Sequence, residues 1–279
     1  MTKTTEKYVF QTDSELVLNT FSQSKSYLVE YNEQVKQKKC VLYFSSNNIY
    51  FPNNATVFSK EIIKKNKYEW YGTRINDASK HIFIRDIKKQ WYLNGINGEV
   101  NSPEKLFELL KKETDGYEIT TLGSSAGGYA AVLFGQLLNA KHIYSFNGQF
   151  EINSLLNKST ESVDPIVFRN KNNKALKPYY DLYDFIKNPK SIYYFGSYYS
   201  TWDKEQYDHI KDHNLWVFRF ITNHHGIPFL KSILPELLNM KVDDLLKRKG
   251  NFINPLLFSV AIGGWKKTIA GIKKIILKK

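Results

Sequence analysis

A serine between two glycines is the first pattern in the chain that could do chemistry. Residues 123–127 read Gly-Ser-Ser-Ala-Gly, a G-x-S-x-G sequence. Only Ser125 has a glycine two residues away on both sides, because the residues at those distances from Ser124 are leucine and alanine. An apolar segment, 119–122, precedes the pattern, and an Ala-rich segment, 129–138, follows it. A strand, a sharp turn and a helix in this order predict a nucleophile elbow that exposes the Ser125 hydroxyl.

The same turn would supply hydrogen-bond donors for a negatively charged oxygen. The backbone N–H of Ala126 lies at the start of the following helix, and the positive end of that helix points to the same place. A second N–H is expected from the loop after an early strand. The apolar run 40–44 predicts that strand, and Ser46 is the second residue after it. The alternative interpretation is a Gly/Ser turn that joins a strand to a helix without any chemistry.

A reactive serine needs a base to take its proton, and histidine has a suitable pKa. In this type of site the chain order is serine, acid, histidine, which restricts the choice to histidines late in the sequence. His225 is the candidate, because Gly226 after it frees the loop to turn the ring inward. His224 is the alternative.

The acid of the site is expected between the serine and the histidine. Asp203 follows the apolar segment 191–196 by a short loop, and it would accept a hydrogen bond from the histidine and hold its tautomer. Asp208 is the second candidate, but it falls in a charged helical stretch, 205–213, that is expected to face water. Asp203 could instead serve as the N-cap of that helix.

Apolar segments alternate with helical patterns between residues 27 and 239. Strands are expected at 27–31 (paired with 8–10), 40–44, 81–86, 117–122, 141–146, 191–195 and 215–221, and helices from Ser102 onward and at 128–138, 205–213 and 226–239. Strands that alternate with helices at this spacing predict parallel βαβ units. The expected fold class is α/β, of the α/β-hydrolase type, with a mainly parallel, doubly wound sheet.

One catalytic domain followed by a basic tail is the expected organisation. Residues 1–240 would form the α/β-hydrolase-like domain. Within it, residues 150–190 are rich in Asn, Lys and Tyr and contain three of the eight prolines, which predicts an insertion that caps the sheet. Residues 241–279 hold ten Lys or Arg and two Asp, so +8 of the net charge of +13 falls in this tail.

The composition excludes several classes of protein. With 42% hydrophobic residues the chain is not disordered. The single cysteine, Cys40, excludes an internal disulfide framework and a cysteine-based zinc site, and no metal is expected. Only five arginines and no known binding motif argue against a nucleic acid partner. Without an apolar signal segment or an uncharged apolar run of about 20 residues, a cytoplasmic location is expected.

Several of these motifs resemble the α/β-hydrolase-fold O-acetyltransferases of bacterial capsule loci. The resemblance covers about residues 38–240. It depends on the segment Leu122-Gly123-Ser124-Ser125-Ala126-Gly127-Gly128-Tyr129, on Phe195-Gly196 leading to Asp203, on His225-Gly226, and on Arg85-Asp86 with Trp91-Tyr92 and Gly95.

This resemblance implies roles and substrates. Ser125 would be the nucleophile that accepts the acyl group, His225 the base, and Asp203 the residue that orients it. Acetyl-CoA would be the donor and a polysaccharide hydroxyl the acceptor. Two alternatives use the same residues: a serine carboxylesterase that acts on glycan esters with water as acceptor, and a catalytically inactive scaffold that handles glycans at a membrane.

The C-terminal tail carries an amphipathic pattern. Apolar residues recur at spacings of four and three after Pro255, at Phe258, Ile262, Trp265, Ile269, Ile272 and Ile276. Such residues share one stripe of a helix, and the lysines of the tail fall mostly outside it. A basic helix with a tryptophan on its apolar side suits the surface of an anionic membrane, which here would be the inner face of the cell membrane. The alternative is a helix whose stripe packs on the body or on a partner subunit; the oligomeric state is left open.

Overall fold

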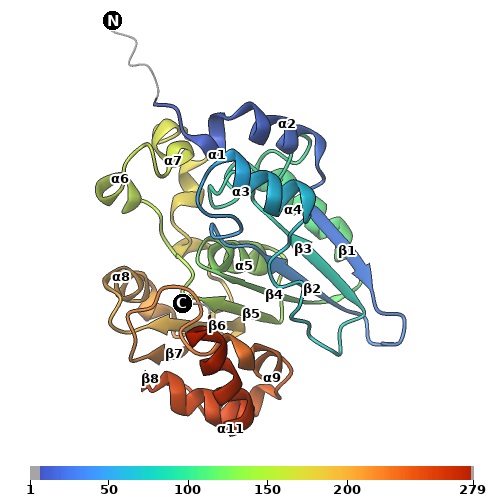
Figure 1. Ribbon diagram of the computed structural model, residues 1–279, viewed down its shortest axis with the longest axis vertical. Coiled ribbons are helices and arrows are strands. Elements are labelled where there is room, and N and C mark those ends of the chain that lie inside the picture. Colours follow the sequence, from blue (N-terminus) through green and yellow to red (C-terminus); the bar gives the residue numbers. More distant parts are fainter. Residues whose placement is uncertain (1–6, 278–279) are drawn as a thin grey trace, which may run out of the picture.

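The central sheet has eight strands in residues 7–277, the part of the chain that the computed structural model describes. The strands are β1 (Tyr27–Tyr31), β2 (Lys39–Phe44), β3 (Lys80–Ile84), β4 (Glu118–Ser124), β5 (His142–Phe146), β6 (Ile192–Ser197), β7 (Trp216–Phe220) and β8 (Gly250–Ile253). Their order across the sheet is β1-β3-β2-β4-β5-β6-β7-β8 (Figure 1). β1 runs antiparallel to β3, and the other adjacent pairs are parallel.

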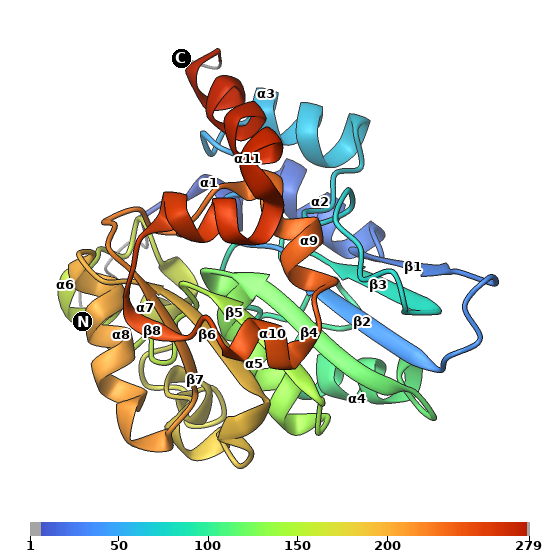
Figure 2. The same ribbon diagram turned by 90° about the horizontal axis from the view of Figure 1, so that it is seen from below.

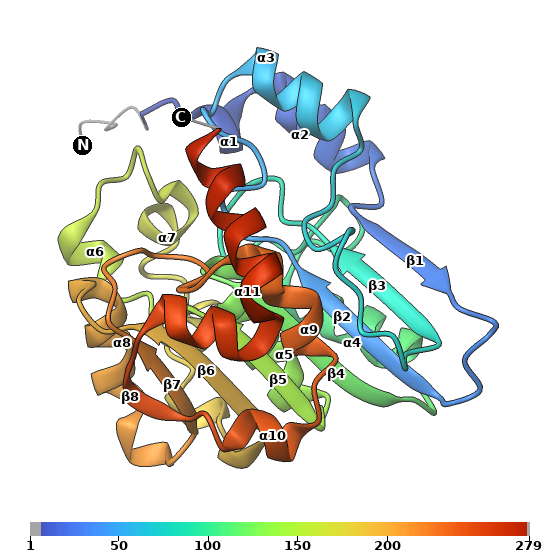
Figure 3. The same ribbon diagram turned by 60° about the horizontal axis from the view of Figure 1, so that its bottom comes forward.

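Helices cover both faces of this sheet (Figures 2 and 3). They are α1 (Phe10–Asp13), α2 (Glu15–Gln23), α3 (Ala55–Phe58), α4 (Pro103–Glu113), α5 (Ala126–Leu137), α6 (Leu155–Lys158), α7 (Pro165–Arg169), α8 (Thr201–Ile210), α9 (Leu234–Leu238), α10 (Val242–Leu246) and α11 (Pro255–Ile276). On one face, α4 and α5 contribute Leu106 and Leu133 to a buried core. On the other, α9 and α11 contribute Leu237 and Phe258 to a second core. The predicted doubly wound α/β class is therefore confirmed.

Strand β2 illustrates why the sheet is buried on both sides. Cys40, Leu42 and Phe44 pack into one core, and Val41 and Tyr43 pack into the other. Successive side chains of a strand point to opposite faces, so a continuous apolar run suits a strand that is covered on both faces. That run is the signal from which the sequence predicts this strand.

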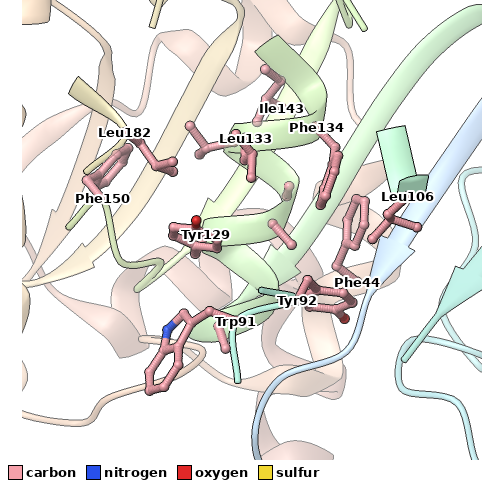
Figure 4. Packing of buried hydrophobic residues seen from close by; sticks show 14 of the residues in the cluster. Phe44, Trp91, Tyr92, Leu106, Tyr129, Leu133, Phe134, Ile143, Phe150 and Leu182 are labelled. Atoms are coloured by element: carbon pink, nitrogen blue, oxygen red, sulfur yellow. The ribbon is translucent and has the colours of Figure 1, made fainter. Parts of the chain in front are cut away.

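Helix α5, which follows the candidate nucleophile, lies at the centre of one core (Figure 4). Its residues from Ala126 to Gln136 are all buried. The ring of Phe134 stacks on that of Phe44 from β2, with ring centroids 5.6 Å apart. The helix is therefore held in place on all sides, and so is the turn at its N-terminus.

The insertion expected at residues 150–190 packs against α5. It consists of α6, α7 and short 3₁₀ turns. The Tyr129 hydroxyl of α5 donates to the carbonyl of Tyr179, and Gln136 Nε2 donates to the carbonyl of Asn188 at 3.1 Å. The insertion thus supports the helix on which the candidate nucleophile depends.

Three elements differ from the sequence prediction for local reasons. Residues 8–10 form no strand with β1: the chain enters α1 there, and β1 pairs with β3 instead. The helix expected at 226–239 is limited to α9, because Gly226 and Pro228 favour an irregular loop before it. β8 is short and includes the exposed Phe252, so it lacks the apolar run from which the buried strands are predicted.

The segment beyond residue 240 adds a strand to the sheet and forms the expected C-terminal helix. β8 pairs with β7 at the edge of the sheet. α11 is kinked at Gly264, whose backbone has φ 73° and ψ 169°. The division into two domains at residue 240 stays a prediction. Among residues 7–277, no helix is both long and apolar enough to cross a membrane.

Candidate active site

Ser125 occupies the strained turn that the sequence predicts between β4 and α5. Its backbone has φ 54° and ψ −125°, a conformation that residues other than glycine rarely adopt. A Cβ atom on Gly123 would lie 2.1 Å from the Gly127 carbonyl oxygen, and one on Gly127 would lie 2.3 Å from the carbonyl oxygen of Phe44. The turn can therefore close only with glycine at both positions. It places Ser125 on the wall of a cavity.

The side chains of Ser125, His225 and Asp203 form a continuous hydrogen-bonded chain. His225 Nδ1 lies 2.7 Å from Asp203 Oδ1, and His225 Nε2 lies 2.8 Å from Ser125 Oγ. A carboxylate accepts from a protonated Nδ1, which leaves Nε2 as the acceptor for the serine hydroxyl. This is the arrangement in which an imidazole can take the proton of a serine as that serine attacks a carbonyl.

Asp203 lies in the first turn of α8, and its carboxylate is free for His225 because another residue caps the helix. Ser200 is the N-cap: its hydroxyl oxygen accepts from the Asp203 N–H at 3.4 Å. The Asp203 side chain is 1% exposed, whereas that of His225 is 33% exposed. The ring of Trp202 stacks on that of His225, with centroids 5.1 Å apart and planes 21° apart. The imidazole is thus fixed from two sides and open to the cavity on another.

The two alternative residues take other positions. His224 lines the same cavity, and burial together with the nearby Lys231 cation lowers the pKa of its ring. Its carbonyl accepts from the Ser197 hydroxyl at 2.6 Å. Asp208 pairs with Lys204 one turn away on an exposed part of α8. The structure therefore brings His225 and Asp203 to Ser125, rather than either alternative.

The expected oxyanion donors differ in their availability. Ala126 is the first residue of α5, where a backbone N–H has no partner within the helix. The Ser46 N–H donates to Glu69 Oε2 at 2.6 Å, and the Ser46 hydroxyl donates to Glu69 Oε1 at 3.1 Å. The N–H of Ser46 is therefore occupied by a carboxylate of the protein itself. Its use for a substrate oxygen stays a prediction and requires Glu69 to move.

Glu69 is a member of the site that the sequence does not reveal. It lines the same cavity as Ser125 and His225. Burial raises the pKa of its carboxyl group, although the two hydrogen bonds from Ser46 and the cations of Lys67 and Lys231 act in the opposite direction. It belongs to the long connection between β2 and β3 and has no motif around it, so only its position in space identifies it.

Asn147 connects the ends of β5 and β6 to the loop that carries the base. Its Nδ2 donates to Ser197 Oγ at 2.8 Å, to the Gly226 carbonyl at 2.9 Å and to the His224 carbonyl at 3.2 Å. Its Oδ1 accepts from the Ser197 N–H at 2.8 Å. One buried amide therefore fixes the backbone on both sides of His225.

Gln149 connects the nucleophile to the loop after β3. Its Nε2 lies 3.5 Å from Ser125 Oγ, and its Oε1 accepts from the Trp91 indole at 3.0 Å. Asn147 and Gln149 directly follow β5, where side chains at the carboxyl end of a parallel strand reach a common edge of the sheet. The sequence therefore contains a positional signal for both residues, although no motif marks them.

The Arg85-Asp86 and Trp91-Tyr92 segments hold the loop next to the site in place. The Asp86 carboxylate accepts from four backbone N–H groups, those of Lys88, Lys89, Gln90 and Tyr92. The turn held in this way carries Tyr92, whose hydroxyl donates to the Ser45 carbonyl at 2.9 Å. These residues therefore position the loop that contains Ser46.

The cavity beside Ser125 has a volume of about 560 Å³. Its lining comes from three parts of the chain: residues 46–48 with 69–73, the elbow, and the segment 224–234. Part of the cavity wall thus belongs to the connection between β2 and β3, while no residue of the insertion at 150–190 is among the lining residues. A second cavity of about 600 Å³ shares the lining residues His224, Ile227 and Lys231 with the first and continues beneath α11.

A metal site does not emerge from the described residues: no cluster of three or more His, Cys, Asp or Glu in positions 7–277 could hold an ion. Cations are nevertheless present in the lining of the two cavities. Lys231 lines both cavities, and Lys274 lines the second. These two ammonium groups are candidates to bind an anionic part of a substrate.

Comparison with known proteins gives similarity at the level of the fold. No protein-family model and no curated protein sequence matches this chain. The structure is similar to the capsule O-acetyltransferase of Neisseria meningitidis serogroup A, with 14% identity over 70% of this chain and 85% of that chain and a TM-score of 0.47. The similarity therefore includes the group of enzymes that the sequence motifs resemble.

Two further solved structures are also similar. A protein of unknown function from Staphylococcus aureus subsp. aureus Mu50 has 14% identity, with 79% of this chain and 93% of that chain covered and a TM-score of 0.46. An S-formylglutathione hydrolase from Agrobacterium tumefaciens has 10% identity, with 82% and 93% covered and a TM-score of 0.45. The α/β-hydrolase class itself rests on the sheet and the elbow described above.

Proposed function

We propose that this protein is a serine-dependent O-acetyltransferase that moves an acetyl group from acetyl-CoA to a hydroxyl group of a capsular or surface polysaccharide. The observation that carries the proposal is the hydrogen-bonded chain from Ser125 Oγ through His225 to Asp203. A serine held in this way is a nucleophile for a thioester or ester carbonyl, and the strained turn keeps it exposed to the cavity.

In the first half of the reaction the acetyl group passes to the protein. Ser125 Oγ attacks the thioester carbonyl while His225 Nε2 takes the hydroxyl proton, and the Ala126 N–H stabilises the oxyanion that forms. The tetrahedral intermediate collapses by breaking the carbon–sulfur bond. The thiolate leaves with the proton held on His225, which yields CoA thiol and an acetyl ester on Ser125.

In the second half an acceptor hydroxyl replaces the thiol. His225 takes the proton of the acceptor as its oxygen attacks the acetyl ester on Ser125, and the proton then returns to Ser125 Oγ. Asp203 stabilises the imidazolium that forms in both halves. The net reaction forms one oxygen ester and breaks one thioester, with no change in oxidation state.

The charges around the site support an anionic donor. CoA carries phosphate groups. Lys231 lines the cavity of Ser125, and Lys274 lines the second cavity, which shares His224, Ile227 and Lys231 with the first. A lysine ammonium group binds phosphate as a point charge. The solved structures of the meningococcal capsule O-acetyltransferase include one in complex with CoA.

A second candidate function is a carboxylesterase that releases acetate from glycan esters. One observation favours it: the His225 side chain is one-third exposed, so water has access to the base. Transfer and hydrolysis share the acyl-enzyme and differ only in which hydroxyl reaches it. An inactive scaffold is the least supported alternative, because the three side chains are already connected.

The test compares Ser125→Ala with Ser124→Ala, since both serines line the same cavity. Purified protein is incubated with acetyl-CoA, with and without an O-deacetylated capsular polysaccharide, and free CoA thiol and polysaccharide-bound acetyl groups are measured. We expect acceptor-dependent thiol release that falls at least about 10³-fold in Ser125→Ala and is largely retained in Ser124→Ala.

Other outcomes would change the assignment. Thiol release or acetate release without any acceptor would favour the esterase. A folded wild-type protein that does not react with a fluorophosphonate at Ser125 would favour the inactive scaffold. Equal activity in Ser125→Ala and wild type would refute a serine mechanism altogether.

A further inference from the structure

The second half of α11, residues 265–276, exposes an apolar stripe to solvent. Trp265, Ile269 and Ile276 have exposed fractions of 66%, 49% and 65%. They recur at spacings of four and seven residues, so they lie on one side of the helix. The described residues thus leave three large apolar side chains on one helix face largely uncovered.

The helix is attached to the body through a different face. Thr268 and Gly271 are buried, and a Cβ atom on Gly271 would lie 2.3 Å from Ser232 Oγ. The Ser232 hydroxyl in turn donates to the carbonyl of Lys267 at 3.3 Å. Small and polar residues therefore make the close contact with the body, which leaves the apolar stripe free for another surface.

The kink at Gly264 separates two environments along α11. Before it, Phe258 is 4% exposed and packs into the core beneath the sheet. After it, Trp265 is the first residue of the exposed stripe. The periodic stripe that the sequence indicates is therefore divided: its first part is buried in the core, and its second part is exposed. Figure 3 shows the change of direction of α11 at the kink.

The charge around the exposed stripe selects the kind of surface that it fits. Lys266 and Lys273 are exposed and lie beside the stripe on the helix. The last acidic residue of the chain is Asp244, so α11 carries cations only. Two copies of this helix would repel one another, and the lysines alone would not explain an exposed tryptophan. An anionic lipid surface satisfies both the apolar and the cationic groups.

We propose that the face of α11 formed by Trp265, Ile269 and Ile276, with the flanking lysines, docks on the surface of an anionic phospholipid bilayer. The apolar side chains enter the boundary between headgroups and acyl chains, and the lysines contact the phosphates. The neighbouring cavity beneath α11 includes Gly271 and Ile275 and adjoins the cavity of Ser125. Docking would therefore hold the candidate active site next to the bilayer.

The experiment is sedimentation of the full chain with two kinds of vesicle. One kind is phosphatidylcholine alone, and the other is phosphatidylcholine with phosphatidylglycerol. We expect the wild-type protein to sediment with the anionic vesicles. Ile269→Glu should bind them at least about tenfold more weakly. Val163→Glu places the same charge at an exposed apolar residue outside α11 and should bind as wild type does.

Several results would overturn the proposal. Wild-type protein that stays in the supernatant with anionic vesicles would contradict it, and so would Ile269→Glu that sediments as strongly as wild type. Equal binding to neutral vesicles would remove the role of the lysines. A dimer of the wild type that Ile269→Glu converts to a monomer, in analytical ultracentrifugation without lipid, would show that the face belongs to a second copy.

The same samples keep this proposal separate from the proposed function. Ile269 lines neither cavity at the site. Hydrolysis of a small soluble ester should therefore be equal in wild type and Ile269→Glu, whether or not either protein binds vesicles. The thermal unfolding temperature of Ile269→Glu is compared with that of wild type. Equal temperatures would show that a loss of binding does not come from misfolding.

Discussion

Asn147 determines where the base sits, although its side-chain hydrogen bonds go to Ser197, His224 and Gly226 rather than to the serine. Its amide donates to the carbonyl groups of His224 and Gly226, on either side of His225. An imidazole takes the proton of a serine efficiently only when the two side chains are held within hydrogen-bond distance. A displacement of about 1 Å can reduce the rate of the reaction about 10²-fold. We regard Asn147 as a positioning residue.

Replacement of the donor at this position should slow the reaction. Asn147→Asp keeps the shape of the side chain but places a carboxylate oxygen against two carbonyl oxygens. We expect kcat to fall about 10- to 100-fold, with a smaller change in KM. The measurement is steady-state hydrolysis of a soluble ester. Asn188→Asp makes the same change at an exposed asparagine and should leave kcat unaltered; equal kcat in both variants would contradict the role of Asn147.

Glu69 should make the stability of the protein depend on pH. Burial raises the pKa of its carboxyl group above the ordinary value of 4.5, so the folded protein holds this proton more tightly than the unfolded chain does. The contribution of Glu69 to stability is therefore lost as pH rises from about 4.5 through the raised pKa. Glu69→Gln cannot ionise, so its free energy of unfolding should increase relative to wild type across that range.

Urea unfolding at several pH values between about 4 and about 8 measures this difference. Glu61→Gln is the matched control, because the hydrogen bond from Lys65 lowers the pKa of Glu61. Its stability relative to wild type should decrease only at the acidic end of this range, near pH 4.5, and stay constant above about pH 6. A Glu69→Gln difference that does not depend on pH would show that the carboxyl group has the same pKa in both states.

Single residues of the site differ in how far the sequence reveals them. Ser125 is defined by its two glycines, and chain order restricts the acid and the base to a few positions. Ser46 is predictable as a residue after β2, but its bond to Glu69 is not, since their encounter depends on how a long connection folds. Asn147 and Gln149 follow a strand that is predictable, yet many polar residues do so without entering a site.

Among the elements, the turn between β4 and α5 has the least freedom to vary. Its glycines bring two backbone segments into direct contact, so a methyl group at Gly123 has no space. Gly123→Ala should lower the free energy of unfolding by about 3 kcal/mol or more. Gly72 has nothing within 4 Å of an added Cβ, so Gly72→Ala should change stability by less than about 1 kcal/mol.

Urea denaturation of the two alanine variants checks this expectation. The pair matches in chemistry and differs only in the space available. If both variants unfolded at the same urea concentration, the close approach of Gly123 to the Gly127 carbonyl would have no effect on stability. If Gly123→Ala remained folded, its ester hydrolysis would show whether Ser125 had kept its place.

Buried elements are easier to predict than edges and connections. β2 and β5 appear as apolar runs because both of their faces are covered. The start of α4 is marked by Ser102, whose hydroxyl oxygen accepts from the Lys105 N–H as an N-cap. β8 lies at an edge of the sheet and lacks such a run, and the kink of α11 depends on a single glycine. Local patterns therefore define the centre of the fold better than its border.

For the whole molecule, the order of the strands contains information that no local pattern provides. β3 follows β2 in the chain but lies between β1 and β2, and the next strand, β4, lies on the other side of β2. The sequence predicts that the sheet is parallel. The order of the strands within it depends on how the connecting segments pack on the two faces. The connection between β2 and β3 contributes residues 69–73 to the lining of the Ser125 cavity.

The distance along the chain between Ser125 and His225 has a consequence for synthesis. The two residues are 100 positions apart, and the acid lies between them. A ribosome therefore synthesises Ser125 well before His225. Strands β6 and β7 must join the sheet before the imidazole can reach the serine. Until then, Ser125 has no imidazole beside it to take its proton. Labelling of this serine by an acylating probe would thus count finished, folded molecules and ignore every shorter one.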